Sequence, residues 1–324
     1  MVLRNVFRSR RSLIERLGFS PVVLGAVLCL QAHAQQLSFG GATKTPANDT
    51  NQGSPSIVYC NGQVWMYYVN HGSAPNYIYA DEAPFGSPVS TGIAAYVGGL
   101  GDVGVSCSEG TTLLFYVDTG KDPRYSYGSG ATFHGNYLIP TPEGFNANIV
   151  PAPANDVGGY TYFVLVGNSN YVYKYSVIPG ETPVYLAETS NIAADSRPTM
   201  TVYNGVPWFG FLSGPLRTAW VGNINSCCYE LPTSIEWGNS NFDGFYASIA
   251  LVQYGTYLYV FGQDEVSSQY LKYTYSTNGT SWGNAVYFTS TQMRWTPSLT
   301  VDGSTIYLVY QDDSNTNISY QTGS

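Results

Sequence analysis

The chain lacks several features that would point to common functions. Only 10% of its 324 residues are charged, and its 3 histidines do not have the spacing of a zinc site with its cysteines. No segment shows a convincing apolar period of 3.6 residues, so we expect almost no helix. Lys and Arg number 13 against 21 Asp and Glu, which makes nucleic acid and anionic membrane surfaces poor partners. We expect no metal and no cofactor.

The first 34 residues differ from the rest of the chain. A basic stretch with five arginines precedes an apolar run from Pro21 to Leu30 and an A-x-A pattern at Ala32-His33-Ala34. This order predicts a signal peptide over residues 1–34 and a mature domain over 35–324, which is secreted or periplasmic. The apolar run is too short to span a bilayer, which disfavours the alternative of a retained anchor.

The chain is rich in residues that suit strands and tight turns, with 29 Tyr and 35 Gly. One pattern recurs along it: a short strand, a turn with glycine, and a second strand of aromatic and branched residues. Successive turn glycines are 48, 48, 47, 50 and 48 residues apart, which is typical of four-stranded propeller blades. They are Gly62, Gly110, Gly158, Gly205, Gly255 and Gly303.

The repeats predict an all-β fold, a six-bladed β-propeller of four-stranded antiparallel blades. A third strand follows each hairpin, and the sixth repeat has no fourth strand after it. We expect the segment Gln36–Gly40 to supply that strand, since this closure would remove an exposed sheet edge. A β-helix is the alternative, although its repeats are usually shorter. Residues 86–104 and 181–196 are expected to be long loops that could cover the channel.

Two segments resemble a known motif. Residues 276–282, Ser-Thr-Asn-Gly-Thr-Ser-Trp, resemble the Asp-box of the sialidase superfamily, Ser-x-Asp-x-Gly-x-Thr-Trp, with Asn278 at the Asp position and one spacer residue fewer. A weaker copy, with Gly128 at the Asp position, covers residues 126–133. The resemblance implies a sialidase-like propeller with these BNR-type repeats in turns between third and fourth strands. The motif is structural, so it implies the fold rather than an activity.

The catalytic residues of sialidases are incomplete in this sequence. The family has a Phe-Arg-Ile-Pro stretch and three arginines that bind the substrate carboxylate. No Phe-Arg-Ile-Pro occurs here, and of the four arginines after residue 34, Arg197 and Arg294 alone stand at the start of a predicted inner strand.

Residues just before the inner strands of a propeller converge on one funnel. Three carboxylates, two arginines and an aromatic ring fall there, a set that suits the hydroxyl groups and apolar face of a sugar. In a hydrolase, two of the carboxylates would act as acid and as base or nucleophile. The aspartates could instead cap turns through backbone amides. The predicted ligand-binding residues are Gln52, Asn148, Arg197, Arg294 and Trp295, and the predicted catalytic ones, if the protein is a hydrolase, are Asp102, Asp195 and Asp243.

Four cysteines follow the predicted signal peptide. Cys60 and Cys107 could bridge the first two blades, but their offsets from the turn glycines differ by one, and from this we expect two free buried thiols. Cys227 and Cys228 are adjacent, and they form a vicinal disulfide able to pack on a ligand, remain free thiols or pair elsewhere. The tyrosines of the inner strands are expected to pack between blades. They are Tyr67, Tyr162, Tyr259, Tyr307 and Tyr310.

Three functions are compatible with these features. The first is a non-catalytic, lectin-like propeller that binds a carbohydrate or glycoconjugate, which the many aromatics favour. The second is a glycoside hydrolase, sialidase-like or similar to the five-bladed arabinanase-like enzymes. The third is a protein-binding scaffold, because propellers host many functions.

Overall fold

The computed structural model describes residues 36–45, 53–70, 74–96, 103–142, 144–189, 192–214, 217–235, 237–238, 241–242, 245–246, 248–264, 269–312 and 317–324. The chain divides into two compact units, Met1–Gln36 and Leu37–Ser324, and the second is the propeller. This boundary lies two residues past the predicted cleavage site, while cleavage itself stays a prediction. Over the ranges given, the chain forms strands and turns, and it contains no helix of the length and hydropathy needed to cross a membrane.

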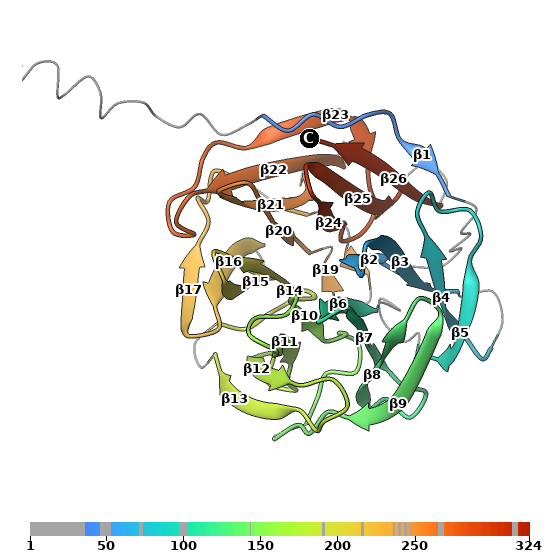
Figure 1. Ribbon diagram of the computed structural model, residues 1–324. Helices are drawn as coiled ribbons and strands as arrows, with labels where there is room; N and C mark the ends of the chain where they lie inside the picture. Colours follow the sequence, from blue (N-terminus) through green and yellow to red (C-terminus); the bar gives the residue numbers. More distant parts are fainter. Residues whose placement is uncertain are drawn as a thin grey trace, which may run out of the picture. The chain divides into compact units, whose positions relative to one another are not determined.

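Six four-stranded antiparallel sheets form the blades of a propeller around a central channel (Figure 1). The prediction of an all-β, six-bladed propeller is confirmed. In blades 1 to 5 the strands run outward in chain order, so that the first strand of each is innermost. Blade 1 comprises β2 (Ser56–Cys60), β3 (Gln63–Val69), β4 (Tyr77–Glu82) and β5 (Val89–Ala94); blade 2 comprises β6 (Gly104–Ser108), β7 (Thr111–Val117), β8 (Pro123–Ser129) and β9 (Thr132–Leu138); blade 3 comprises β10 (Ala152–Pro153), β11 (Thr161–Val166), β12 (Val172–Val177) and β13 (Val184–Glu188).

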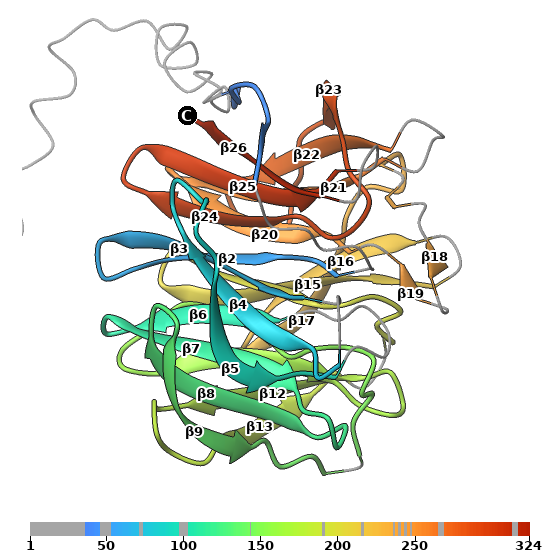
Figure 2. The ribbon, with the colours of Figure 1, turned by 90° about the vertical axis from the view of Figure 1, so that its right-hand side faces the viewer.

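The second half of the ring repeats this plan with one addition. A two-stranded hairpin lies between blades 4 and 5 in the chain, and Figure 2 shows it on one face of the ring. Blade 4 comprises β14 (Thr199–Tyr203), β15 (Val206–Ser213), β16 (Thr218–Asn223) and β17 (Ser226–Glu230); the hairpin is β18 (Asn241–Phe242) and β19 (Phe245–Tyr246); blade 5 comprises β20 (Ala250–Tyr254), β21 (Tyr257–Gln263), β22 (Tyr270–Ser276) and β23 (Val286–Gln292); blade 6 comprises β24 (Ser298–Asp302), β25 (Thr305–Gln311), β26 (Ile318–Gly323) and β1 (Thr43–Lys44).

Two-residue turns join the inner strands, and the glycine does not always take the same place in them. In blade 1, Asn61 and Gly62 form the turn with φ of 52° and 79°, the left-handed values of a type I′ hairpin. In blade 6, Asp302 pairs with Thr305, so Gly303 takes the first place of the turn instead of the second. Repeats that are aligned on their glycines are therefore shifted by one residue between these blades.

The fourth strand of blade 6 comes from the N-terminal side of the chain, as predicted. β1 pairs antiparallel with β26, with Thr43 opposite Tyr320. The pairing extends beyond β1, because Ser38 and Ser324 exchange two backbone hydrogen bonds of 3.2 Å and Phe39 forms a bridge with Gly323. The closing segment, residues 38–45, is thus longer than the predicted Gln36–Gly40. It covers the edge that β26 would otherwise expose.

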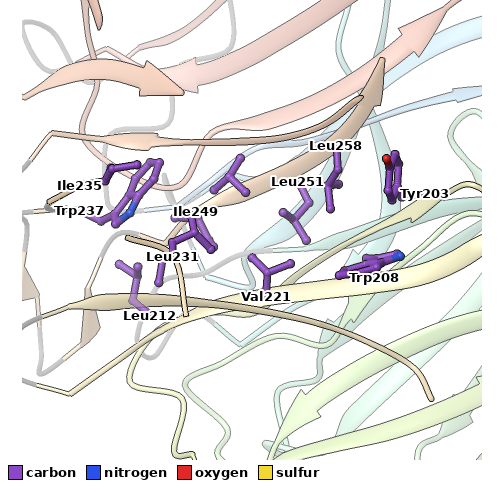
Figure 3. Packing of buried hydrophobic residues seen from close by; sticks show 12 residues of the cluster. Tyr203, Trp208, Leu212, Val221, Leu231, Ile235, Trp237, Ile249, Leu251 and Leu258 are labelled. Atoms are coloured by element: carbon purple, nitrogen blue, oxygen red, sulfur yellow. The ribbon is translucent and has the colours of Figure 1, made fainter. Parts of the chain in front are cut away.

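Neighbouring blades pack face to face through apolar side chains. Between blades 4 and 5, Trp208 and Val221 face Leu251 and Leu258, and Trp237 from the connection covers one end (Figure 3). Of the inner-strand tyrosines, Tyr67, Tyr162 and Tyr307 belong to such interblade clusters, as predicted, and Tyr259 packs on rings of its own blade. Three of the five are at most 2% exposed and two are half-buried. The fully covered ones are Tyr67, Tyr259 and Tyr310, and the half-buried ones are Tyr162 and Tyr307.

The predicted long loops 86–104 and 181–196 each contain an outer strand instead. Residues Val89–Ala94 form β5 and Val184–Glu188 form β13. All five side chains of β13 are exposed, so this strand has no buried face and no alternating apolar pattern. An outer strand of this kind cannot be distinguished from a loop by periodicity.

The prediction of free thiols at Cys60 and Cys107 is wrong, because the two residues form a disulfide between β2 and β6. Their Cα atoms are 5.4 Å apart. Blades related by rotation about the channel present opposite faces to each other. Offsets that differ by one residue put the two side chains on opposite faces of their blades, and in neighbouring blades these are the two faces that meet at the shared interface.

Removal of this disulfide is expected to destabilise the propeller. The bond closes a chain segment with a sequence separation of 47, for which chain entropy predicts a contribution of about 3–4 kcal/mol. The double variant Cys60→Ser/Cys107→Ser should lose about this much free energy of unfolding in denaturant titrations. The matched control Cys227→Ser/Cys228→Ser should change it by less than about 1 kcal/mol, because a bond between adjacent residues closes almost no loop. Equal losses in both would contradict this account.

Candidate functional site

The first candidate site is the channel at the centre of the ring. All six inner strands line it, and the cavity between them has a volume of about 90 Å³. Neighbouring blades are close here, since a Cβ added at Gly104 would lie 2.3 Å from the carbonyl oxygen of Pro151. The described part of the channel therefore offers less space than a pocket that usually holds a small ligand.

Arg197 enters this channel from blade 4. Its Nη2 donates a hydrogen bond of 3.1 Å to Ser56 Oγ in blade 1 and one of 2.5 Å to the carbonyl oxygen of Val103 before blade 2. The side chain therefore crosses the ring to blades on the other side. It is 7% exposed, and Ser56 Oγ also donates to Val103 O at 2.5 Å. In this position Arg197 holds the inner strands together, and its role as a ligand contact stays a prediction.

A chain of buried hydroxyl groups, absent from the sequence prediction, joins blades 4, 5 and 6 beside Arg197. Ser196 Oγ lies 3.0 Å from Ser248 Oγ, and the backbone N–H of Ser248 donates to Thr296 Oγ1 at 2.9 Å. These residues were missed because the repeats were aligned on glycines that occupy different places in their turns. For Thr296 the available signal was a hydroxyl residue directly before a proline, as also in Ser54-Pro55, whereas Ser196 and Ser248 lack this signal.

The other predicted ligand-binding and catalytic residues differ in how exposed their side chains are. The Oδ2 of Asp195 accepts a 2.6 Å hydrogen bond from the backbone N–H of Gly214, which follows β15 and is 19 residues further along the chain. This contact is long-range, unlike a local turn cap. Asn148 is half-buried, Arg294 is exposed, and Trp295 is 5% exposed. None of these four lines the central cavity. Gln52, Asp102 and Asp243 lie outside the described residues.

Candidate metal ligands do not gather anywhere in the part of the chain that the structure covers. No group of three or more His, Cys, Asp or Glu side chains has a metal-binding arrangement within the described ranges.

The segment 276–282 forms the turn between the third and fourth strands of blade 5. Asn278 Oδ1 accepts hydrogen bonds from the N–H groups of Thr280 at 2.9 Å and Ser281 at 2.8 Å, and Ser276 Oγ accepts one from Gly279 at 2.8 Å. A Cβ at Gly279 would lie 2.1 Å from the Trp208 ring of blade 4, so the turn packs against the neighbouring blade. These bonds are what a carboxylate at position 278 would also make. Assignment to the Asp-box stays a prediction.

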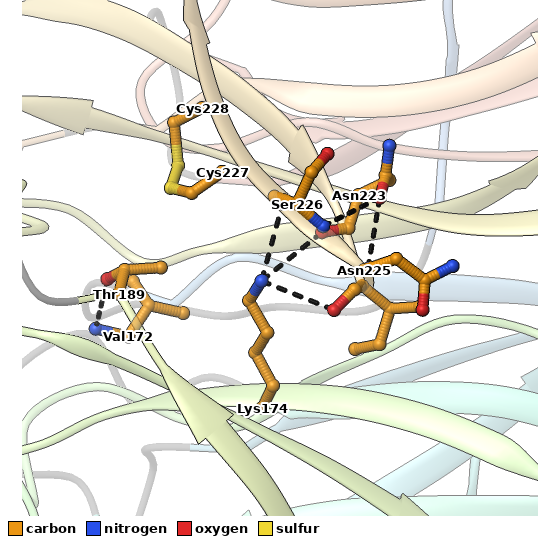
Figure 4. Close-up of a disulfide and its surroundings, with 9 residues drawn as sticks. Val172, Lys174, Thr189, Asn223, Asn225, Ser226, Cys227 and Cys228 are labelled. Atoms are coloured by element: carbon orange, nitrogen blue, oxygen red, sulfur yellow. Dashed lines mark hydrogen bonds between the residues drawn. A yellow bond between two sulfur atoms is a disulfide. The ribbon is translucent and has the colours of Figure 1, made fainter.

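Cys227 and Cys228 form a vicinal disulfide on β17, the outermost strand of blade 4 (Figure 4). Cys227 is exposed, whereas Cys228 packs against the apolar cluster between blades 3 and 4. Beside the pair, the buried Lys174 donates to the carbonyl oxygens of Asn223 and Ile224, each at 3.3 Å. Burial lowers the pKa of Lys174. This position at the rim keeps the disulfide away from any ligand in the channel.

Larger pockets lie between blades, on both sides of the closing segment. A pocket of about 390 Å³ between blades 6 and 1 is lined by Pro84, Tyr307 and other residues. A pocket of about 280 Å³ between blades 5 and 6 is lined by Tyr270, Asp312 and others. Residues 41–43 of the closing segment contribute to one pocket or the other. Both volumes suit a small ligand better than the central cavity does.

The architecture defines the class as a six-bladed β-propeller. No family model and no curated protein sequence matches the chain. In fold it is similar to a Trypanosoma rangeli sialidase in complex with the inhibitor DANA, with a TM-score of 0.59 and 10% identity over 90% of this chain. The chain spans 60% of the length of that sialidase.

Two further structures have the same fold over most of their length. The subtype N10 neuraminidase-like protein of the virus A/little yellow-shouldered bat/Guatemala/060/2010 matches with a TM-score of 0.55 and 9% identity, over 89% of this chain and 99% of its own. The SapL1 lectin in complex with alpha methyl fucoside matches with a TM-score of 0.56 and 12% identity, over 84% of this chain and 93% of its own. At these identities the likeness concerns the fold.

Replacement of Arg197 is expected to weaken the ring. Arg197→Met removes two buried hydrogen bonds from a charged donor and should lower the free energy of unfolding by about 2–4 kcal/mol. Ser56→Ala keeps the bond from Arg197 to Val103 and should cost only about 1 kcal/mol. Denaturant unfolding followed by tryptophan fluorescence measures both. A loss below about 1 kcal/mol in Arg197→Met would show that the channel contacts are not structural.

The turn at 276–282 offers a second stability test. Asn278→Ala removes the acceptor of two backbone N–H groups and should cost about 1–2 kcal/mol, whereas Asn278→Asp keeps the acceptor and should be neutral or stabilising. Thermal unfolding compares the two variants. If both lower the midpoint equally, the turn does not depend on an acceptor at this position.

Proposed function

We propose that the protein is an exported, lectin-like propeller that binds carbohydrate without cleaving it. The observation that carries the proposal is the distribution of space: the described channel holds about 90 Å³ and is crossed by Arg197, while pockets of about 390 and 280 Å³ lie between blades. Tyrosines line both of these pockets. An aromatic ring beside polar groups is the usual composition of a site for a small polar ligand.

The structural neighbours support a carbohydrate partner. They include a Trypanosoma rangeli sialidase in complex with sialic acid and a lectin in complex with alpha methyl fucoside. Both kinds of protein share the blade plan of this chain, although the low identities leave the sugar open.

The hydrolase alternative depends on Asp102, Asp195 and Asp243. Asp195 accepts a hydrogen bond from the Gly214 N–H, which supports a structural role rather than a catalytic one. A lectin requires none of these carboxylates to act as acid or base.

Export is the second part of the proposal. The basic stretch, the apolar run and the A-x-A pattern of residues 1–34 support it. The two disulfides, Cys60–Cys107 and Cys227–Cys228, also support it, because such bonds persist in oxidising compartments.

A glycan array read beside product analysis tests the function. The protein from Gln35 onward should bind at least one glycan class and release no product from it. Asp102→Asn, Asp195→Asn and Asp243→Asn should leave this binding within about twofold, because none of them is needed by a lectin of this kind. Asp302→Asn, at the end of inner strand β24, is the matched control.

Two results would contradict the proposal. Release of sugar that is abolished by Asp102→Asn or Asp243→Asn, and not by Asp302→Asn, would establish a glycoside hydrolase. Absence of binding to any glycan would favour the protein-binding scaffold.

A further inference from the structure

The pocket between blades 5 and 6 has the features of a built site for a polar ligand. Its volume is about 280 Å³, at the small end of ligand pockets and suited to a single sugar ring rather than an oligosaccharide. Apart from Ala42 of the closing segment, its lining comes from β22, β23 and the end of β25. The side chains are Tyr270, Thr289, Ser290, Gln292, Tyr310 and Asp312.

A bulge in the outer strand of blade 5 forms one wall. Tyr270 pairs with Gln292, but the next residue of β22, Leu271, pairs with Phe288, so residues 289–291 are extra in β23. The outer strands of blades 1 to 4 also shift register, but none inserts as many residues. Bulges often re-aim side chains next to a binding site. Here the bulge puts two exposed hydroxyl residues, Thr289 and Ser290, at the pocket.

The bulge is fixed to blade 6 by its third residue. Thr291 is 3% exposed, and its Oγ1 accepts a hydrogen bond of 3.1 Å from Nε2 of Gln321 in β26. This bond crosses from blade 5 to blade 6, and the residues on either side of Thr291, Ser290 and Gln292, line the pocket. The hydroxyls of the neighbouring residues are therefore held on a rigid frame, which lowers the entropic cost of binding.

The opposite wall carries the charge. Asp312 follows β25, and the neighbouring Tyr310 is 2% exposed. Burial and then the Asp312 charge raise the pKa of Tyr310 to about 12, so its hydroxyl stays protonated near neutral pH. Among the described residues, the lining includes this carboxylate and no basic side chain, so it favours a neutral ligand with hydroxyl donors over an anionic one.

The chemistry of the pocket fits one ring of a neutral sugar. Hydroxyl, amide and carboxylate groups from both walls can bond the equatorial or axial hydroxyls of a pyranose, and the half-buried ring of Tyr270 offers an apolar face. We propose that the pocket between blades 5 and 6 is a binding site for a single neutral pyranose. The inference rests on the proposed lectin function and gives it a location and a ligand class. The closing segment completes the site, because Ala42 forms part of its lining.

The pocket between blades 6 and 1 serves as the internal comparison. It is larger, and the part of its lining that the structure describes includes tyrosines, a proline and a glutamine but no charged residue. A charged acceptor makes stronger and more directional hydrogen bonds to hydroxyl groups than a neutral one. This difference favours the pocket with Asp312.

Calorimetric titration with monosaccharides tests the site. The probes are the methyl glycosides of fucose, galactose, mannose and glucose, with sialic acid as the anionic probe. Ser290→Trp fills the pocket and should abolish binding of the neutral sugar that the unmodified protein binds. Asp312→Asn keeps the shape and removes the charge, so it should weaken that binding about tenfold. Sialic acid should bind more weakly than the neutral sugar in the unmodified protein.

The matched control is Thr322→Trp, which fills the pocket between blades 6 and 1. It should leave the affinity for the neutral sugar within about twofold. Circular dichroism and the thermal midpoint establish that each variant is folded, and Asp312→Asn, which changes no volume, decides the question if Ser290→Trp does not fold.

Each remaining outcome overturns a distinct claim. Binding that survives Asp312→Asn and Ser290→Trp but is lost in Thr322→Trp places the site between blades 6 and 1. Binding unaffected by all three variants refutes an interblade site while the lectin function stands. No binding of any glycan by the unmodified protein, on the array or in titration, refutes the lectin function and this site together.

Discussion

Every part of the propeller depends on the pairing between residues 38–45 and β26. Three strands of blade 6 come from the last repeat, and without a fourth the ring would present the open edge of β26 to solvent. The exchange of two backbone hydrogen bonds between Ser38 and Ser324 brings segments from both ends of the chain into one sheet. The same segment lines the pockets on its two sides, so closure of the ring and formation of these pockets are one event.

The inside of the ring explains why the space for a ligand lies between blades. The inner edge of each innermost strand has backbone N–H and C=O groups without a partner in their own sheet. Hydroxyl side chains of the neighbouring blade bond some of these groups; Ser298 Oγ, for example, accepts a 3.1 Å hydrogen bond from the N–H of Ile57. Arg197 adds bonds that cross the channel. These contacts draw the inner strands together and leave a small cavity. The outer strands are bulged and diverge, which opens pockets between neighbouring blades.

The sequence allowed the blade number, the third strands and the closure to be predicted, because turn glycines and apolar strands recur at a regular interval. It predicted the channel residues less well. Glycine takes the second place of the turn at Gly62 and the first at Gly303, so alignment on glycine shifts the repeats. The disulfide between Cys60 and Cys107 was not predicted, because side chains on opposite faces of two neighbouring blades meet only once the blades pack against each other. The bulge at residues 289–291 depends on strand pairing and has no signal in the sequence.

The closing segment also determines how the chain reaches its native state. Thr43 and Tyr320 pair across almost the whole length of the chain, so this contact has a far larger sequence separation than the hairpins within each blade. Contacts of this kind form late and make folding slow. Until they form, the outer edge of β26 has no partner strand and can pair with a strand of another chain. Aggregation during folding should therefore compete with one step, the docking of residues 38–45.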